Sequence, residues 1–269
     1  MSVVRVAAVQ LCSTDDIEAN LAQVRRLVGR AAEQGAEFIA LPENFGYLRR
    51  EGLSSPCAQG VDGPFVGCLK ELACEHDVWL LGGSFPEAIP QSDRVYNCSA
   101  LVSSAGECVA TYRKIHLFDV DLGRDGGSFR ESDAIAAGDA VVDVTTPFGQ
   151  VGLSICYDLR FPELYRELAT RGVHFVTVPA AFAPGTGRDH WEVLLRARAI
   201  ENQVFVIAPA QCGEHSADRA SYGRSMIIDP WGLVLASAGD EPAVCVADCD
   251  LDHLERVRKS IPCLDNRRL

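Results

Sequence analysis

The chain has 269 residues, of which 48% are hydrophobic and 23% are charged, and its formal net charge is −12 at pH 7. This composition is typical of a globular protein and excludes a low-complexity or collagen-like chain. The acidic charge argues against nucleic acid or an anionic membrane surface as a partner, and no apolar run approaches the ~18 residues that a membrane-spanning helix needs.

Strand and helix patterns alternate along the whole chain. Apolar residues recur at helical spacing over residues 15–34, and helices are also predicted at residues 63–76, 162–171 and 190–202. Strands are predicted at residues 1–11, 37–41, 78–85, 96–103, 174–178, 204–208, 225–228 and 243–247. The alternation indicates an α/β fold. Because segments such as residues 100–111 look like hairpins, we expect mixed sheets.

Three charged residues lie where local structure alone does not explain them. The strand at residues 37–41 runs into Pro42 and Glu43, which places Glu43 at the carboxyl end of a strand. Lys114 lies among strand-like apolar and aromatic residues, where a lysine needs a carboxylate partner or a substrate. His116 is expected on the same face of that strand as Lys114. Glu131, which follows the glycine-rich residues 123–127, has the weakest local support.

Cys156 ends the apolar run at residues 151–155, ahead of a helix predicted to begin at Pro162. A strand-to-helix turn is a place where enzymes hold nucleophiles. We expect the positive end of the following helix to ease ionisation of the thiol, and the backbone N–H of Tyr157 to face a developing oxyanion. Residue type alone would favour a buried structural cysteine.

Three segments, in this order, resemble the signatures of the nitrilase superfamily of carbon–nitrogen hydrolases. They are Leu41-Pro42-Glu43, Tyr112-Arg113-Lys114-Ile115-His116-Leu117-Phe118-Asp119 and Ile155-Cys156-Tyr157-Asp158-Leu159-Arg160-Phe161-Pro162-Glu163. The resemblance extends from Val3 to near the C-terminus. It implies a four-layer α-β-β-α sandwich that dimerises through helical faces.

The resemblance also implies catalytic roles. Glu43 would be the general base, Lys114 the oxyanion stabiliser, Cys156 the nucleophile and Glu131 a second, positioning carboxylate. The chemistry of amide hydrolysis independently requires the same residue types. A thiol nucleophile needs a general base, and the negative charge that develops on the carbonyl oxygen needs a cation or an N–H donor. Residues 122–130 lack the Pro-Gly turn of relatives, so the resemblance transfers less directly to Glu131.

Within the superfamily, residues 190–201, 210–213 and 219–223 most resemble the deaminated glutathione amidases. The ω-amidases, which act on α-ketoglutaramate, are close relatives, and both substrates join an α-keto acid to an amide. The resemblance implies that Arg160 holds the carboxylate of this small anionic substrate, with Phe182 and Thr186 lining the same end of the pocket. The expected reaction converts deaminated glutathione to α-ketoglutarate and cysteinylglycine through a thioester. Hydrolysis of α-ketoglutaramate is the alternative.

Other interpretations use the same residues. A nitrilase, an N-carbamoyl amidohydrolase or an N-acyltransferase would keep the catalytic set, whereas a non-catalytic interaction protein would have no reason to. A Cys-His hydrolase would need a histidine such as His190, which we interpret as structural. The alternative for Arg160 is an ion pair with Asp158 or Glu163.

Motif and cysteine patterns bear on cofactors and compartment. The eleven cysteines form neither a disulfide framework nor a Cys-x-x-Cys pair, and Cys245 and Cys249 lie in an alternating strand pattern that favours core packing over a zinc site. The glycine-rich segments match neither a phosphate-binding loop nor a dinucleotide fingerprint, so we expect no cofactor and no metal. The beginning of the sequence lacks the features of a signal peptide. We therefore expect a single domain over residues 1–269 in the cytoplasm, with reduced thiols.

Overall fold

The computed structural model describes residues 3–49, 57–121 and 128–268. The glycine-rich segment at residues 123–127 and the first two residues of the predicted N-terminal strand lie outside the described residues. Within these ranges, no helix is both long enough and apolar enough to cross a bilayer.

The first sheet is mixed, because β1 pairs with β2 in parallel and with β17 in antiparallel orientation. In the described part of the chain its strand order is β17 (Ala243–Asp250), β1 (Val3–Gln10), β2 (Phe38–Ala40), β3 (Trp79–Ala88), β4 (Val95–Val102) and β5 (Cys108–Arg113). The short strand β8 (Ile135–Ala136) pairs with β4. The predicted hairpin at residues 100–111 is formed by β4 and β5.

The second sheet is also mixed, with β10, β11 and β12 parallel and its outer strands antiparallel. Its order is β16 (Val234–Ser237), β15 (Met226–Ile228), β12 (Phe205–Ala208), β11 (Phe175–Thr177), β10 (Gly149–Leu153) and β9 (Asp143–Thr146). Two hairpins lie outside the sheets, namely β6 (Asp119–Asp121) with β7 (Ser128–Arg130), and β13 (Cys212–Ser216) with β14 (Arg219–Tyr222).

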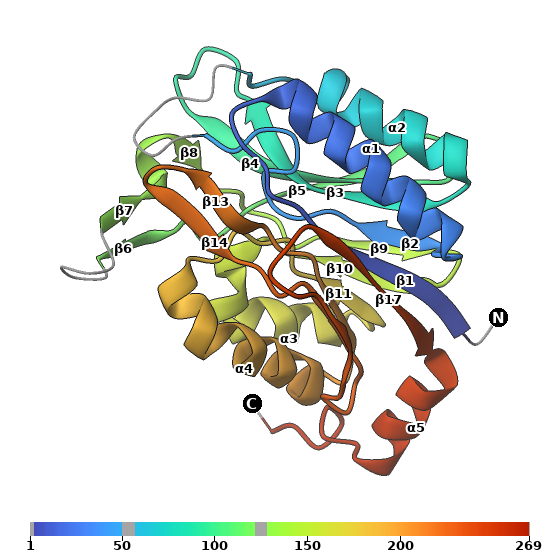
Figure 1. The fold of residues 1–269 in the computed structure, drawn as a ribbon. Helices are drawn as coiled ribbons and strands as arrows, with labels where there is room; N and C mark the ends of the chain where they lie inside the picture. Colours follow the sequence, from blue (N-terminus) through green and yellow to red (C-terminus); the bar gives the residue numbers. More distant parts are fainter. Residues whose placement is uncertain (1–2, 50–56, 122–127, 269) are drawn as a thin grey trace.

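Helices cover the outer faces of both sheets (Figure 1). The helices α1 (Ile17–Glu33) and α2 (Pro64–His76) lie on the first sheet, and α3 (Pro162–Thr170) and α4 (Pro184–Asn202) lie on the second. A further helix, α5 (Leu251–Ser260), follows β17, and the short 3-10 helices are η1 (Glu131–Asp133) and η2 (Cys156–Arg160). This arrangement confirms the predicted four-layer α-β-β-α sandwich with mixed sheets.

The helix α1 illustrates how the sequence pattern produces an element. Asp16 caps its N-terminus, because the side chain accepts a hydrogen bond from the backbone N–H of Ala19 at 3.0 Å. Its buried face is formed by residues at helical spacing, among them Val24, Leu27 and Ala31. The predicted helix over residues 15–34 is confirmed, with Asp16 as its N-cap and Gln34 as its C-cap.

The strand β1 is buried on both faces from Val6 onward, whereas Val3 and Arg5 are exposed. Val4, Val6 and Ala8 belong to a core that both sheets share, whereas Ala7 and Val9 pack into the core beneath α1 and α2. A strand that is covered on both sides is typically a continuous apolar run, and residues 6–9 of β1 form such a run.

Two helices differ from the prediction. The helix α4 begins at Pro184, six residues before the predicted start at residue 190. Gly185 and Gly187 disfavour a helix locally, but a Cβ on Gly187 would lie 2.4 Å from the Tyr222 Cβ, so close packing requires glycine there. The helix α5 was not predicted, and it is anchored by buried Leu254 and Val257.

Candidate active site

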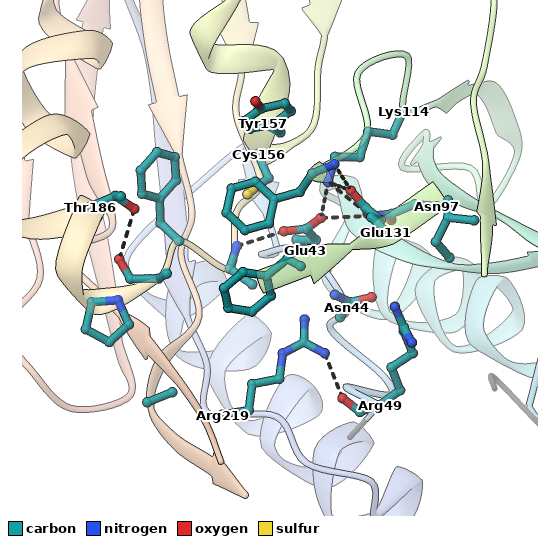
Figure 2. Close-up of a pocket in the computed structure, with 18 of the residues that line it drawn as sticks. Glu43, Asn44, Arg49, Asn97, Lys114, Glu131, Cys156, Tyr157, Thr186 and Arg219 are labelled. Atoms are coloured by element: carbon teal, nitrogen blue, oxygen red, sulfur yellow. Dashed lines mark hydrogen bonds and ion pairs between the residues drawn. The ribbon is translucent and has the colours of Figure 1, made fainter. Parts of the chain in front are cut away.

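Glu43 lies just beyond the carboxyl end of β2, on a segment whose backbone is tightly enclosed. A Cβ on Gly83 would lie 1.9 Å from the Pro42 carbonyl oxygen, so the close approach of the two chains requires glycine. On the other side, the Gln211 side chain donates a hydrogen bond to the Glu43 carbonyl oxygen at 2.9 Å. These contacts direct a carboxylate that is 4% exposed into a cavity (Figure 2).

Lys114 immediately follows β5, and its ammonium lies between two carboxylates. Nζ donates to Glu131 Oε2 at 2.8 Å and Oε1 at 3.0 Å, and to Glu43 Oε1 at 3.2 Å. Glu131, the first residue of η1, also accepts a hydrogen bond from the backbone N–H of Phe118 at 2.6 Å. Two carboxylates therefore compensate for the burial of one ammonium.

Asn97, on β4, is a member of the site that sequence reasoning missed. Its Nδ2 donates to Glu43 Oε1 at 2.8 Å and lies 3.5 Å from Glu131 Oε1, so it links the two carboxylates. The backbone N–H of Ala181 completes the set by donating to Glu43 Oε2 at 2.9 Å. Asn97 could have been found from the sequence, because it is a polar residue in the otherwise mainly apolar strand β4. The Ala181 N–H could not, because a backbone donor is not specified by residue type.

Cys156 begins η2, which follows β10 after two residues. Its φ of 47° lies in the left-handed region, which is rare for residues other than glycine and is found at functional sites. The conformation is held by a hydrogen bond from the Cys156 N–H to the Pro179 carbonyl oxygen at 2.8 Å. The predicted helix does begin at Pro162, but the nucleophile candidate lies on the 3-10 turn before it.

The fully buried Asp158 carboxylate supports this turn. It accepts hydrogen bonds from the Ile155 N–H at 2.8 Å and from the Tyr112 hydroxyl at 2.7 Å. His116 Nδ1 lies 2.8 Å from the same carboxylate, and its ring stacks on Phe161. The prediction that His116 shares a strand face with Lys114 is wrong, because β5 ends before either residue.

The charges of the buried site depend on one another. Burial alone would raise the pKa of Glu43, but the Lys114 ammonium and hydrogen bonds from Cys156 and Asn97 bring this pKa below its ordinary value. Burial would lower the pKa of Lys114, but the Glu131 and Glu43 carboxylates outweigh it and raise the pKa. The site therefore holds an ionised carboxylate beside an ionised ammonium.

The expectation that the Cys156 thiol ionises easily is wrong. Burial and the negative charge of Glu43 raise the pKa of Cys156 well above its ordinary value, although Lys114 acts in the opposite direction. The thiol is consequently protonated while its neighbour Glu43 is ionised. A protonated thiol beside a carboxylate is the starting state of a nucleophile that needs a general base.

A cavity of about 790 Å³ adjoins these groups and is lined by Arg160, Phe182 and Thr186. The Arg160 guanidinium lies 5.1 Å from the Phe182 ring centre, and Nη1 lies 3.3 Å from His190 Nδ1. No ion pair between Arg160 and either Asp158 or Glu163 occurs among the described residues. Its guanidinium is thus directed to the cavity wall beside an aromatic ring.

Tyr157 also lines the cavity, and it lies in the first turn of η2. Backbone N–H groups in the first turn of a helix have no carbonyl acceptor in a preceding turn, so they can donate a hydrogen bond to a ligand. Tyr157 follows Cys156 directly, and both line the cavity together with Lys114 (Figure 2). No histidine is found among the described residues that line the cavity, which favours the carboxylate over a Cys-His pair.

The sequence matches the family model described as carbon–nitrogen hydrolase over residues 5–259. Proteins named deaminated glutathione amidase are similar to it: that of Synechocystis sp. is 43% identical over 97% of both chains, and that of Rattus norvegicus is 44% identical over 98% of this chain and 82% of its own.

A solved structure has the same fold. The Caenorhabditis elegans NitFhit protein superposes with a TM-score of 0.90 at 36% identity, covering 100% of this chain and 66% of its own. The match extends through both sheets and the segments that carry Glu43, Lys114 and Cys156. This chain is a member of the nitrilase superfamily of carbon–nitrogen hydrolases.

Proposed function

We propose that the protein is an amidase that hydrolyses deaminated glutathione to α-ketoglutarate and cysteinylglycine through a cysteine thioester. The observation that carries the proposal is the convergence of Glu43, Lys114, Glu131 and Cys156, from separate elements, on one cavity. The relatives named for this activity support the choice of substrate.

In the first half-reaction, Glu43 takes the proton of the Cys156 thiol as the sulfur attacks the amide carbonyl carbon. The carbonyl oxygen becomes negatively charged and is held by the Lys114 ammonium and the Tyr157 N–H. When the tetrahedral intermediate collapses, Glu43 gives the proton to the departing nitrogen. The carbon–nitrogen bond breaks, the amine leaves and the acyl group remains as a thioester on Cys156.

In the second half-reaction, Glu43 takes a proton from a water molecule that attacks the thioester. The same two donors hold the new oxyanion. Collapse breaks the carbon–sulfur bond, and the proton returns to Cys156, so the enzyme ends in its starting state. Because the pKa of Glu43 is lowered, both half-reactions begin with an ionised Glu43 carboxylate, and because the pKa of Cys156 is raised, the released thiol is protonated again at the end.

Glu131 acts as a positioning carboxylate, because it holds the Lys114 ammonium through both of its oxygens. Arg160 binds the α-keto carboxylate, for which a planar guanidinium is suited. Phe182 and Thr186 line that end of the cavity. No residue in this scheme requires a cofactor.

The direct test compares kcat/KM for deaminated glutathione and α-ketoglutaramate, with Cys156→Ala as the blank. A preference of ~100-fold or more for deaminated glutathione, worth roughly 2.7 kcal/mol of transition-state discrimination, supports the proposed substrate. The reverse preference would assign the protein as an ω-amidase, and turnover of neither would refute both.

We also propose that the protein forms a homodimer through α4. Large apolar side chains are exposed on this helix and on the neighbouring turn between β15 and β16, namely Val193, Ile200, Trp231 and Leu233. Gly232, between Trp231 and Leu233, lies against the Ile200 side chain, so exposed apolar residues of the helix and the turn are neighbours, as is typical of an interface. Light scattering should report a dimer for the wild type and a monomer for Val193→Glu. Val109→Glu, at an exposed position on β5, should remain dimeric.

We also propose that the protein is a single domain and that it is located in the cytoplasm. One core draws residues from both sheets, which supports cooperative unfolding, and calorimetry should show a single transition. All eleven cysteines are free thiols. Alkylation of protein taken directly from its native cells should label all of them under denaturing conditions if the compartment is reducing.

A further inference from the structure

The cavity extends well beyond the catalytic residues. Its lining includes Arg160, Phe182 and Thr186, and also the segment after Glu43 and the hairpin of β13 and β14, whose Arg49 and Arg219 lie apart from Thr186 in Figure 2. An amide and one short acyl chain do not need all of this lining. The segment after Glu43 and the hairpin form a second part of the cavity, which is available to the group attached to the amide nitrogen.

Two arginines define this second part. Arg49 and Arg219 both line the cavity, and Arg219 Nη1 donates a hydrogen bond to the Arg49 carbonyl oxygen at 2.7 Å. In the view of Figure 2, Cys156 and Tyr157 lie on one side of Glu43, and the two arginines lie on the other. Glu214 and Asp218, on the same hairpin as Arg219, also line the cavity, so the two guanidinium groups are the cations of this end beside two carboxylates, and their planar donor geometry is suited to a carboxylate ligand.

Asn44 connects the second part of the cavity to the reacting atoms. It follows Glu43 directly, lines the cavity and has a φ of 58°, in the left-handed region. Its N–H donates to the Ser84 hydroxyl at 2.9 Å, which holds this backbone in place. Asparagine tolerates this conformation better than most residues, and such strain gathers at binding sites. An amide side chain thus stands between the general base and the arginines.

From these contacts we infer a second anion-binding subsite, formed by Arg49, Arg219 and Asn44, that binds the carboxylate of the leaving group. The inference rests on the proposed function and deepens it. Deaminated glutathione has one carboxylate on its acyl part and another at the end of cysteinylglycine. The two residues of this dipeptide span at most about 7 Å when extended, which is a length that a cavity of this size accommodates.

The subsite provides a physical basis for substrate choice. Arg160 faces the acyl carboxylate, which deaminated glutathione and α-ketoglutaramate share. The Arg49 and Arg219 subsite faces a carboxylate that only deaminated glutathione carries, because ammonia is the leaving group of the other substrate. Discrimination therefore resides in the segment after Glu43 and the hairpin of β13 and β14, and not in the catalytic residues.

The test uses a matched pair of substrates, deaminated glutathione and its C-terminal amide, which differ only in the leaving-group carboxylate. Wild type should hydrolyse the free acid with a kcat/KM about 10- to 100-fold higher than the amide, the range for a hydrogen bond to a charged group. Arg219→Met should lower kcat/KM for the free acid to that for the amide. Arg25→Met, a surface arginine paired with Glu71, should keep the wild-type preference.

The outcomes separate the subsite from the proposed function. Equal loss on both substrates in Arg219→Met would mean that the residue acts through structure, and this would overturn the inference, as would an unchanged preference. If wild type hydrolyses neither substrate, the proposed function fails. Calorimetric titration of Cys156→Ala with cysteinylglycine and with its amide then tests the subsite without turnover. Tighter binding of the free acid that is lost in Cys156→Ala/Arg219→Met supports it, and equal binding refutes it.

Discussion

Replacing Lys114 by methionine tests how much of the site depends on one ammonium. Nζ lies 2.8 and 3.0 Å from the oxygens of Glu131 and 3.2 Å from Glu43, and the side chain is 2% exposed. Loss of one oxyanion donor lowers kcat by about 10²- to 10³-fold. Breaking a buried ion pair destabilises a protein by about 3–5 kcal/mol, because the remaining charge has no compensation. Lys114→Met should show both effects.

The rate is measured as kcat on deaminated glutathione, and the free energy of unfolding by urea denaturation. Lys70→Met is the matched control, since that side chain is 35% exposed and its ammonium lies 3.8 Å from Asp62. A surface pair of this kind contributes up to about 1 kcal/mol, so the control should retain both rate and stability.

A second substitution separates the two effects. Adding Glu131→Gln to Lys114→Met removes one uncompensated carboxylate, so part of the lost stability should return while kcat stays low. If folded Lys114→Met keeps kcat within about tenfold of wild type, the ammonium does not stabilise the oxyanion. If the double variant recovers no stability, the Glu131 charge is not what the ammonium compensates.

Three further predictions concern Glu43 and its support. Glu43→Gln should lower kcat by more than about 10³-fold, because the base is lost, while alkylation of Cys156 by iodoacetamide should shift to lower pH, since the carboxylate that raises the thiol pKa is gone. In the wild type, the pKa of Glu43 is lower in the folded protein than in the unfolded chain, where it is about 4.3. The ionised carboxylate therefore stabilises the fold above the unfolded pKa, and this stabilisation is lost as the pH falls through the folded pKa. Denaturation at pH 3 to 7 should therefore show the wild type losing more stability on acidification than Glu43→Gln. Gly83→Ala should destabilise the protein by about 1–3 kcal/mol and lower kcat, because the new Cβ meets the Pro42 carbonyl. The control is Gly67→Ala in α2, which has open space around it and should be neutral or stabilising in thermal denaturation.

Elements whose signal is local were predicted well. The helix α1 follows from apolar spacing and its capping aspartate, and α3 begins at Pro162 as predicted. On the partly exposed strand β17, Cys245 and Cys249 are buried in the core, as the alternating pattern indicated. In contrast, α4 begins six residues before its predicted start, because packing of Gly187 against Tyr222 overrides the low helix propensity of glycine.

In the candidate site, too, the residues with a local signal were predicted and those that depend on tertiary contacts were not. Glu43, Lys114 and Cys156 could be singled out because a charged or nucleophilic residue at a strand end is unusual in its local context. Asn97 and the Ala181 N–H escaped attention, because their role depends on contacts across the sheets. The ionisation of Cys156 was predicted in the wrong direction, since the following helix was the only neighbour that the sequence displayed.

The sequence by itself determined the alternation of strands and helices, the family and the chemical types of the catalytic residues. These depend on spacing and on motifs of a few neighbouring residues. Tertiary structure alone decided that Lys114 lies between Glu43 and Glu131, that the thiol is protonated beside an ionised base, and that Arg49 and Arg219 line one cavity with Cys156. Electrostatic interactions act through space, so their sign and size follow from distances and burial that only the packed sheets establish.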